Sequence, residues 1–130
     1  LDAWLVHLQT GEVITPFSDG PAGRLHYAED GSMYAFLHHP GWADGTAGLS
    51  SFPLFSAYSG EWSLKDGTVC HLVRFSSVAE TIGSRLERLV NVQGNGRLTL
   101  STGWEAWSGP GPGRIRHELH WHRSDQAPPA

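Results

Sequence analysis

The sequence predicts an all-β protein, built as a single antiparallel up-and-down β-barrel of about eight strands. Sixteen glycines and eight prolines in 130 residues divide the chain into short segments. Many of these segments alternate apolar and polar side chains, the period of a half-buried strand. They are joined mainly by tight hairpins, and closing such a sheet into a barrel removes the exposed edges that promote aggregation.

The expected strands follow one another along the chain, and tight turns join three pairs of them. In order, the strands are residues 3–9, 24–28, 32–38, 55–64, 68–77, 85–92, 97–102 and 114–122. The pairs Asp30-Gly31 and Asp66-Gly67, and the run 93–96 (Gln-Gly-Asn-Gly), predict hairpin turns, because Gly and Asn accept the positive φ that such turns need. A Gly/Pro loop at 108–113 precedes the last strand.

Three further segments do not follow the strand pattern. Residues 40–53 are rich in Gly, Ala and Ser, and we expect a short helix or lid there. Residues 78–84 are expected to cross one mouth of the barrel. We expect residues 1–123 to form one domain and the polar, proline-rich residues 124–130 to form a disordered tail.

Composition and charge exclude several classes of function. The net charge is −4 and the basic residues are scattered, which argues against nucleic acid or a membrane surface as partner. No apolar run has the length of a membrane helix, and Leu1 does not open a signal peptide, so a cytoplasmic location is expected. The single Cys70 excludes an internal disulfide. No phosphate-binding glycine loop is present, so no cofactor is expected; a homodimer stays open.

Motifs along nearly the whole chain resemble a known family. They are Gly-Arg-Leu-His-Tyr at 23–27, Asp30-Gly31, Met33, Tyr58-Ser59-Gly60, His71, Gly83, Arg88, Leu-Thr-Leu-Ser-Thr at 98–102, and Trp121. In this order they resemble the bacterial and fungal lipocalin-like domain family over residues 3–123. The sequence departs from that pattern at its start, where Asp2-Ala3-Trp4 replaces Gly-x-Trp, and in the pair His38-His39.

The resemblance implies a calycin-type barrel with a pocket for a small, largely apolar molecule. Some relatives accompany enzymes of secondary metabolism, and small barrels of related shape catalyse cyclisation or isomerisation of polyketide-like substrates. We therefore expect a tailoring enzyme for an apolar, oxygen-bearing substrate of polyketide or terpenoid type, acting by cofactor-free cyclisation, isomerisation or dehydration. The alternative is a non-catalytic carrier of a small hydrophobic molecule.

Strand alternation directs three candidate catalytic side chains into the lumen. Arg88 is expected to hold a substrate oxyanion, because an unpaired buried charge is costly. His71 titrates near neutral pH and would act as acid or base, and Tyr58 would donate a hydrogen bond or a proton. The alternative remains open: Arg88 pairs with Glu61 or Glu105, and the other two side chains are satisfied core residues.

A second set of side chains is expected to surround the ligand. Two tryptophans, other aromatic rings, aliphatic side chains and one further histidine favour a planar or polycyclic guest. The set is His117, Trp62, Phe75, Val73, Leu86, Val90, Leu100, Leu119, Tyr34 and Trp42.

A metal site is a weaker alternative. His120 and His122 lie on one side of a predicted strand together with Glu118, which is a plausible ligand set for zinc or iron. If Trp121 faces the core, however, this side faces solvent beside two arginines. No resident metal is therefore expected.

Overall fold

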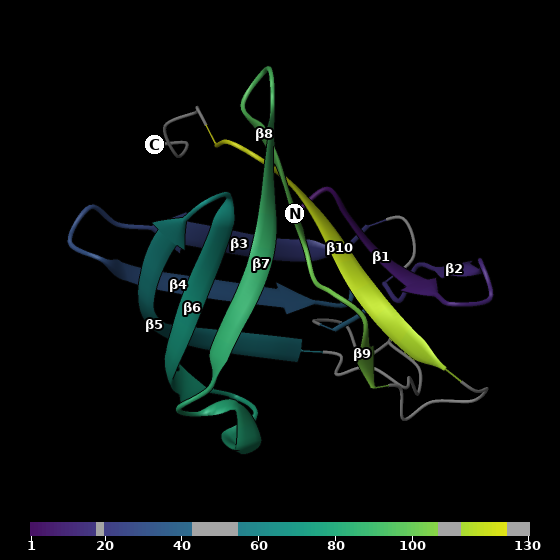
Figure 1. Cartoon of the computed structure of the whole chain (residues 1–130), viewed down its shortest axis with the longest axis horizontal. Helices are drawn as coiled ribbons and strands as arrows, with labels where there is room; N and C mark the ends of the chain where they lie inside the picture. The colour runs from purple at the N-terminus through teal and green to yellow at the C-terminus, as the bar shows by residue number, and fades with distance from the viewer. Residues whose placement is uncertain (18–19, 43–54, 107–112, 125–130) are drawn as a thin grey trace.

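A computed structural model describes residues 1–17, 20–42, 55–106 and 113–124. The prediction of an all-β, antiparallel protein is confirmed (Figure 1). The strands are β1 (Ala3–Leu8), β2 (Val13–Ile14), β3 (Ala22–Tyr27), β4 (Ser32–His38), β5 (Phe55–Lys65), β6 (Thr68–Ser76), β7 (Arg85–Gln93), β8 (Arg97–Ser101), β9 (Glu105–Ala106) and β10 (Arg114–His122). The 3₁₀ helix η1 (Ala79–Thr81) joins β6 to β7. Within the described ranges, no helix is long and apolar enough to cross a membrane.

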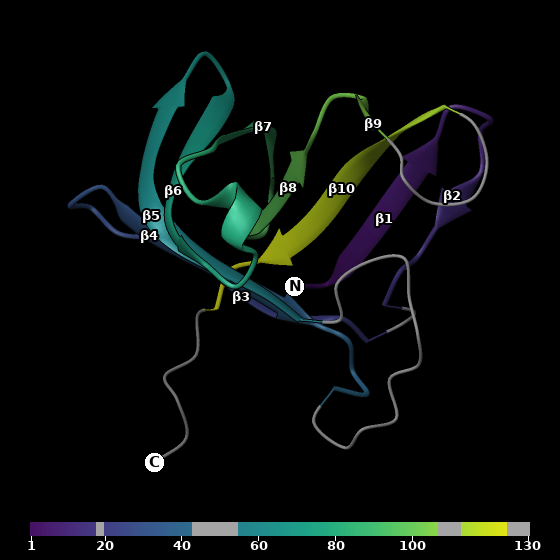
Figure 2. The same ribbon diagram turned by 90° about the horizontal axis from the view of Figure 1, so that it is seen from below.

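The strands form one curled sheet in the order β2-β1-β10-β8-β7-β6-β5-β4-β3, and β9 pairs with β10. Neighbours from β3 to β8 are consecutive in the sequence, as the up-and-down prediction requires. The curl is visible in Figure 2, where β3 lies beneath the other strands and close to the N-terminus.

Strand pairing does not close the sheet into a complete barrel, so the prediction is wrong on closure alone. In the described part of the chain, β3 and β2 are the two edges of the sheet. Closure would require β3 to pair with β1, but the far edge of β1 is taken by β2 through Val6 and His7. One main-chain hydrogen bond spans the gap, from the Leu1 nitrogen to the Gly23 carbonyl at 3.1 Å. We call this gap between β3 and the start of β1 the seam.

The interior of the curl holds two apolar clusters. The first contains Trp4, Val6, Phe17 and Ile115, all buried. The second contains Val69, Leu100 and Trp121, and partly buried side chains from β3 pack against it. Burial of apolar area on this scale is the main term that stabilises the fold. Leu119 contacts both clusters and so connects them.

The hairpin turns form where the sequence predicts them. Gly31, Gly67 and Gly96 all have positive φ, and so do Asp66 (52°) and Asn95 (66°). Such backbone angles are strained for most side chains, which explains why Gly, Asn and Asp stand there.

A β-bulge in β6 changes which side chains face inward. Ser59 pairs with Phe75 and Gly60 with Val73, so Arg74 is the extra residue. A Cβ at Gly60 would lie 1.8 Å from the carbonyl oxygen of Leu72, so only glycine permits this close approach. Because the extra residue reverses the alternation, Phe75 lies on the outer face with 73% of its surface exposed. The predicted position of Phe75 in the lumen is therefore wrong.

The irregular segments are only partly described. Residues 78–84 contain η1, a single turn with no buried residue. Residues 40–42 form a turn, and the rest of the predicted helix or lid at 40–53 lies outside the described residues. The same holds for residues 125–130 of the predicted tail.

Candidate ligand-binding site

His71 lies at the centre of a buried polar cluster. It stands in the regular half of β6, where Val69, His71 and Val73 face inward on alternate positions. Only 1% of its surface is exposed. The strand pattern of the sequence, apolar at every second position, therefore carries an imidazole into the interior.

Two tyrosines hold the imidazole from both sides. The Tyr27 hydroxyl lies 2.6 Å from Nε2 of His71, and the Tyr58 hydroxyl lies 2.6 Å from Nδ1. Tyr27 belongs to β3 and Tyr58 to β5, so strands on both sides of β4 supply the pair. Tyr27 was not among the predicted site residues. The signal for it was its spacing of two from Leu25, which faces the second apolar cluster.

Burial keeps all three groups neutral. Burial, with a smaller contribution from the positive charge of Arg88, lowers the pKa of His71 to about 4. Burial likewise raises the pKa of Tyr27, with a smaller contribution from Tyr58, and raises the pKa of Tyr58 itself. Arg88 opposes both of these increases. At neutral pH the cluster therefore contains one neutral imidazole and two phenols.

The number of hydrogens in this cluster determines whether it can still donate a hydrogen bond to a ligand. A neutral imidazole carries one N–H and one acceptor nitrogen, so one tyrosine donates to His71 and the other accepts from it. The accepting tyrosine keeps its own O–H hydrogen. No other acceptor for either hydroxyl is found in the described residues. The cluster thus has one phenol hydrogen free to donate to a ligand.

Arg88 places a positive charge beside this cluster. It lies on the inward side of β7 with Leu86 and Val90, and is half-buried. Its Nη1 donates to the Glu87 carbonyl at 3.0 Å. The charge acts on the pKa values of four groups: Tyr27, Tyr58, His71 and His117.

The alternative in which Arg88 pairs with Glu61 or Glu105 is wrong. Glu61 accepts from Arg74 at 2.9 Å on the outer face, and Glu105 lies 3.6 Å from His117. No carboxylate of the described residues lies within ion-pair distance of Arg88. Its guanidinium is therefore available to an anionic or strongly polar group of a ligand.

His117 forms a second polar position on the inward side of β10. Its Nδ1 accepts the Trp4 indole N–H at 3.1 Å, and its Nε2 faces Glu105. Burial lowers the pKa of His117; Glu105 raises it, and Arg88 lowers it. The neutral imidazole therefore carries its hydrogen on Nε2, toward the carboxylate.

Most of the predicted ligand-lining side chains face inward. Trp62 packs on the Tyr27 ring with centroids 5.0 Å apart and donates to the Ala28 carbonyl at 2.8 Å. The aliphatic members of the predicted set are buried or half-buried: Val73, Leu86, Val90, Leu100 and Leu119.

Tyr34 and Trp42 differ from the rest of the predicted set. The expected inward position of Tyr34 is wrong, because Met33 and Ala35 take the buried side of β4. Tyr34 instead stacks on His26 at the outer surface, at 5.2 Å. Trp42 is half-exposed in the turn after β4 and packs against Phe55; its contact with a ligand stays a prediction.

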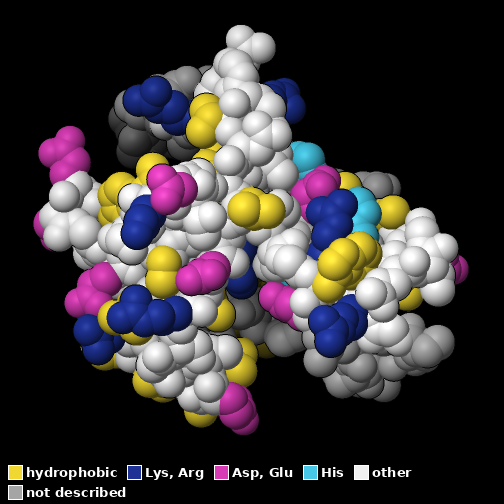
Figure 3. Space-filling model, viewed as in Figure 1, with side chains coloured by type: hydrophobic (Ala, Val, Ile, Leu, Met, Phe, Trp, Pro, Cys, Tyr) yellow, Lys and Arg dark blue, Asp and Glu magenta, His cyan; other side chains and the backbone are white. Residues whose placement is uncertain are grey.

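The histidines of the metal alternative do not converge on one point. His120 Nε2 bonds to Glu118 at 2.7 Å, whereas His122 Nδ1 bonds to Asp2 at 2.6 Å. Glu118 also lies 3.6 Å from Arg116. Figure 3 shows histidine, acidic and basic side chains gathered over β1 and β10. This side of β10 is an ion-pair network, and no group of three or more metal-binding side chains occurs in the described ranges.

The single curled antiparallel sheet, with its core on the inner side, places the chain in the class of small all-β proteins. A family model for the lipocalin-like domain matches residues 1–124, and the chain belongs to this family. Membership indicates a fold that binds small hydrophobic ligands. Neither the curated proteins nor the solved structures give a match to the chain.

Proposed function

We propose that the chain is a cofactor-free tailoring enzyme that binds a small apolar molecule through a carbonyl oxygen. This proposal rests on one observation: the neutral His71 is held between two tyrosines, and the guanidinium of Arg88 lies beside them. The reaction class is cyclisation, isomerisation or dehydration through an enol or enolate, the intermediate that these groups stabilise best.

The stabilisation follows from the direction of the hydrogen bonds. The substrate oxygen accepts the free phenol hydrogen, and the same phenol oxygen accepts the N–H of His71. As negative charge develops on the substrate oxygen, this chain and Arg88 stabilise it in a water-poor interior. Such preorganised donors act on the transition state more strongly than on the neutral substrate.

His71 works through the tyrosines rather than by direct contact. Both of its ring nitrogens are occupied, so a ligand reaches it only across a phenol. When one phenol gives its proton to the substrate oxygen, His71 can replace that proton and take one from the second phenol. The second phenol is then a phenolate until the enol oxygen returns its proton along the same chain. His71 is thus a positioning residue, and the tyrosine that donates to the substrate is the catalytic residue.

A second function, carriage of the same molecule without reaction, is supported by a separate observation. Removing an α-hydrogen needs a base, and both nitrogens of His71 are already bonded. His117 likewise has its Nδ1 occupied by Trp4. If the ligand does not meet another base, the site holds a carbonyl compound without converting it.

Two probes separate these functions. 4-Nitrophenol resembles an enolate when ionised, and its absorbance reports the phenolate form. We expect it to bind as the phenolate, with at least about tenfold weaker affinity for Tyr58→Phe and for Arg88→Gln, since each loses one hydrogen bond or charge contact. Cyclohex-3-enone then tests catalysis, because its conversion to the conjugated 2-enone appears as new ultraviolet absorbance.

Matched controls lie on the outer face. Tyr34→Phe and Arg85→Gln remove the same functional groups outside the lumen and are expected to leave both probes unaffected. Binding without isomerisation identifies a carrier of such compounds. Equal binding of nitrophenolate by Arg88→Gln, Tyr58→Phe and the unaltered chain excludes both functions at this site.

A further inference from the structure

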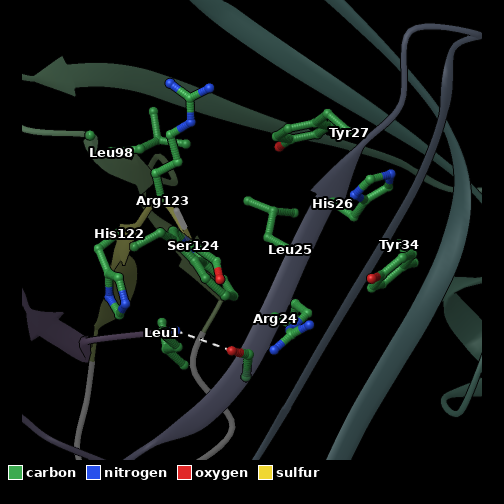
Figure 4. Close-up of a pocket in the computed structure, with 13 residues that line it drawn as sticks. Leu1, Arg24, Leu25, His26, Tyr27, Tyr34, Leu98, His122, Arg123 and Ser124 are labelled. Carbon is green, nitrogen blue, oxygen red and sulfur yellow. Dashed lines mark hydrogen bonds between the residues drawn. The ribbon is translucent and has the colours of Figure 1, made fainter. Parts of the chain in front are cut away.

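A cavity at the seam reaches one of the two phenols that hold His71. It has a volume of about 620 Å³, within the range of small-molecule sites. Both edges of the seam line it: β3 on one side, and the ends of β8 and β10 on the other (Figure 4). Tyr27, at the end of β3, is one of its lining residues, whereas Tyr58 is not. The cavity therefore distinguishes two tyrosines that lie at the same distance, 2.6 Å, from the imidazole.

The side chains near Tyr27 give this cavity an apolar wall. Leu25 comes from β3, and Leu98 lies on the opposite edge. Trp121 also lines the cavity, and its buried indole N–H has no hydrogen-bond partner in the described structure. Several other lining side chains are basic. In Figure 4 the hydroxyl of Tyr27 points from β3 toward the opposite edge, so the cavity presents a phenol to any molecule within it.

The position of the spare phenol hydrogen follows from this difference between the tyrosines. One of them donates to His71, and the other keeps its hydrogen for a different acceptor. A hydrogen left on Tyr58 would be buried with no acceptor among the described residues, which is unfavourable. A hydrogen left on Tyr27 meets a cavity in which water or a ligand oxygen accepts it. The favoured arrangement therefore has Tyr58 donating to Nδ1, and Nε2–H donating to Tyr27.

We infer that Tyr27 is the phenol that donates to the ligand, and that the ligand lies in the seam cavity with its carbonyl oxygen at this hydroxyl. The inference rests on the proposed function and makes it more specific, because it names the catalytic tyrosine and the cavity that holds the substrate. The apolar body of the ligand lies against Leu25, Leu98 and Trp121. Arg88 is not a lining residue, but its positive charge acts on the Tyr27 hydroxyl and so on an oxygen bonded to it.

The first test locates the hydrogen on the imidazole of His71. Nitrogen NMR of the ¹⁵N-labelled chain shows which ring nitrogen carries it, and His71→Gln assigns the signals. We expect the hydrogen on Nε2, both in the free chain and with 4-nitrophenol bound. A hydrogen on Nδ1 would leave the spare phenol hydrogen on Tyr58, and it would overturn the inference whether or not the probe binds.

The second test compares the two tyrosines by the affinity of the chain for 4-nitrophenol. Tyr27→Phe should weaken binding by at least about a further fivefold relative to Tyr58→Phe, since Tyr27 contacts the probe and Tyr58 acts only through His71. Urea unfolding establishes that each variant is folded under the conditions of the titration. An equal or greater loss for Tyr58→Phe would contradict the assignment of Tyr27 as the donor.

The third test places a negative charge in the cavity. Leu25→Asp and Leu98→Asp act from opposite edges, and each should weaken binding of the nitrophenolate at least about tenfold by repulsion. The matched control, Leu89→Asp, changes an exposed leucine on the outer side of β7 and should leave binding unaffected. If Arg88→Gln weakens binding but neither cavity variant does, the proposed function stands and the seam cavity is not its substrate site.

Discussion

The inner side of β6 and the outer side of β10 use the same side chain in opposite ways. His71 on β6 is buried and bonded to two neutral phenols, whereas His120 and His122 on β10 are bonded to carboxylates near solvent. Inside, burial and the charge of Arg88 favour the neutral imidazole. Outside, both imidazoles instead bond to carboxylates, His120 to Glu118 and His122 to Asp2. The partner and its exposure, not the residue type, decide what a histidine can do.

The largest contrast is expected in stability when each histidine is replaced by leucine. His71→Leu leaves two buried hydroxyls without their partner, at about 1–3 kcal/mol for each, so we expect a loss of roughly 4 kcal/mol. His120→Leu removes a partly exposed ion pair and should cost less than about 1 kcal/mol. Urea unfolding followed by tryptophan fluorescence measures both. Similar losses for the two variants would contradict the contrast.

The second effect is the pH dependence of stability that the buried His71 causes. The pKa of His71 is about 4 in the folded chain against 6.5 for an unperturbed histidine, so the unfolded chain binds the proton more readily. Its contribution to stability is therefore complete above pH 6.5, falls as the pH drops toward 4, and does not change further below that value. The total is on the order of 3 kcal/mol, at about 1.4 kcal/mol per pKa unit.

The comparison that isolates this effect uses His71→Gln, which can hydrogen-bond but does not titrate in this range. Urea unfolding at a series of pH values should show the unaltered chain losing stability relative to this variant as the medium is acidified. A constant difference between the two chains over that range contradicts the buried, neutral state of His71.

The third prediction compares the stability lost on truncating an inner and an outer side chain on either side of the bulge in β6. Val73 is fully buried just before Arg74, and Phe75 is exposed just after it. Val73→Ala should destabilise the fold by about 2 kcal/mol through the lost methyl groups and the cavity they leave, whereas Phe75→Ala should cost less than about 1 kcal/mol. Thermal unfolding measures the pair. A greater loss of stability for Phe75→Ala would contradict the outward position of Phe75 and the bulge at Arg74.

The smallest effect belongs to the ion pairs of β10. Partial burial raises the pKa of Glu118, but the hydrogen bond and charge of His120, with the charges of His7 and Arg116, together lower it below its usual 4.5. Its contribution is therefore present above pH 4.5 and is lost as the pH falls through the lowered value. Glu118→Gln should cost under about 1 kcal/mol at neutral pH and nothing in strong acid, measured by urea unfolding. A cost that persists in strong acid indicates a packing role instead.

The sequence predicts the strands and the inward residues wherever the strand pattern is regular. Asp-Gly and Asn-Gly located three hairpins, and alternation along β5 and β6 placed Tyr58 and His71 on the inward side. The prediction that Phe75 faces inward was wrong because a one-residue bulge leaves no trace in the alternation of apolar residues. The prediction that Tyr34 faces inward was wrong because both sides of β4 are apolar, so the sequence pattern does not distinguish the inner side from the outer side.

The remaining features depend on contacts between distant strands. The two-residue strand β2, which pairs with β1 at one edge of the open sheet, is too short to produce a periodic signal. The Tyr27–His71–Tyr58 arrangement joins β3, β6 and β5, and no local pattern predicts which phenols meet one imidazole. The same holds for Arg88, because its two alternative carboxylate partners, Glu61 and Glu105, are paired with other residues.

The central claim is that His71 is a neutral imidazole fixed between two phenols. Nitrogen NMR of the ¹⁵N-labelled imidazole measures this directly, because the shifts of Nδ1 and Nε2 report which nitrogen carries hydrogen. We expect two well-separated nitrogen shifts, typical of one neutral tautomer, that stay constant through neutral pH and change only near pH 4. A midpoint at 6.5 or above, or two averaged shifts of equal value, would contradict the account.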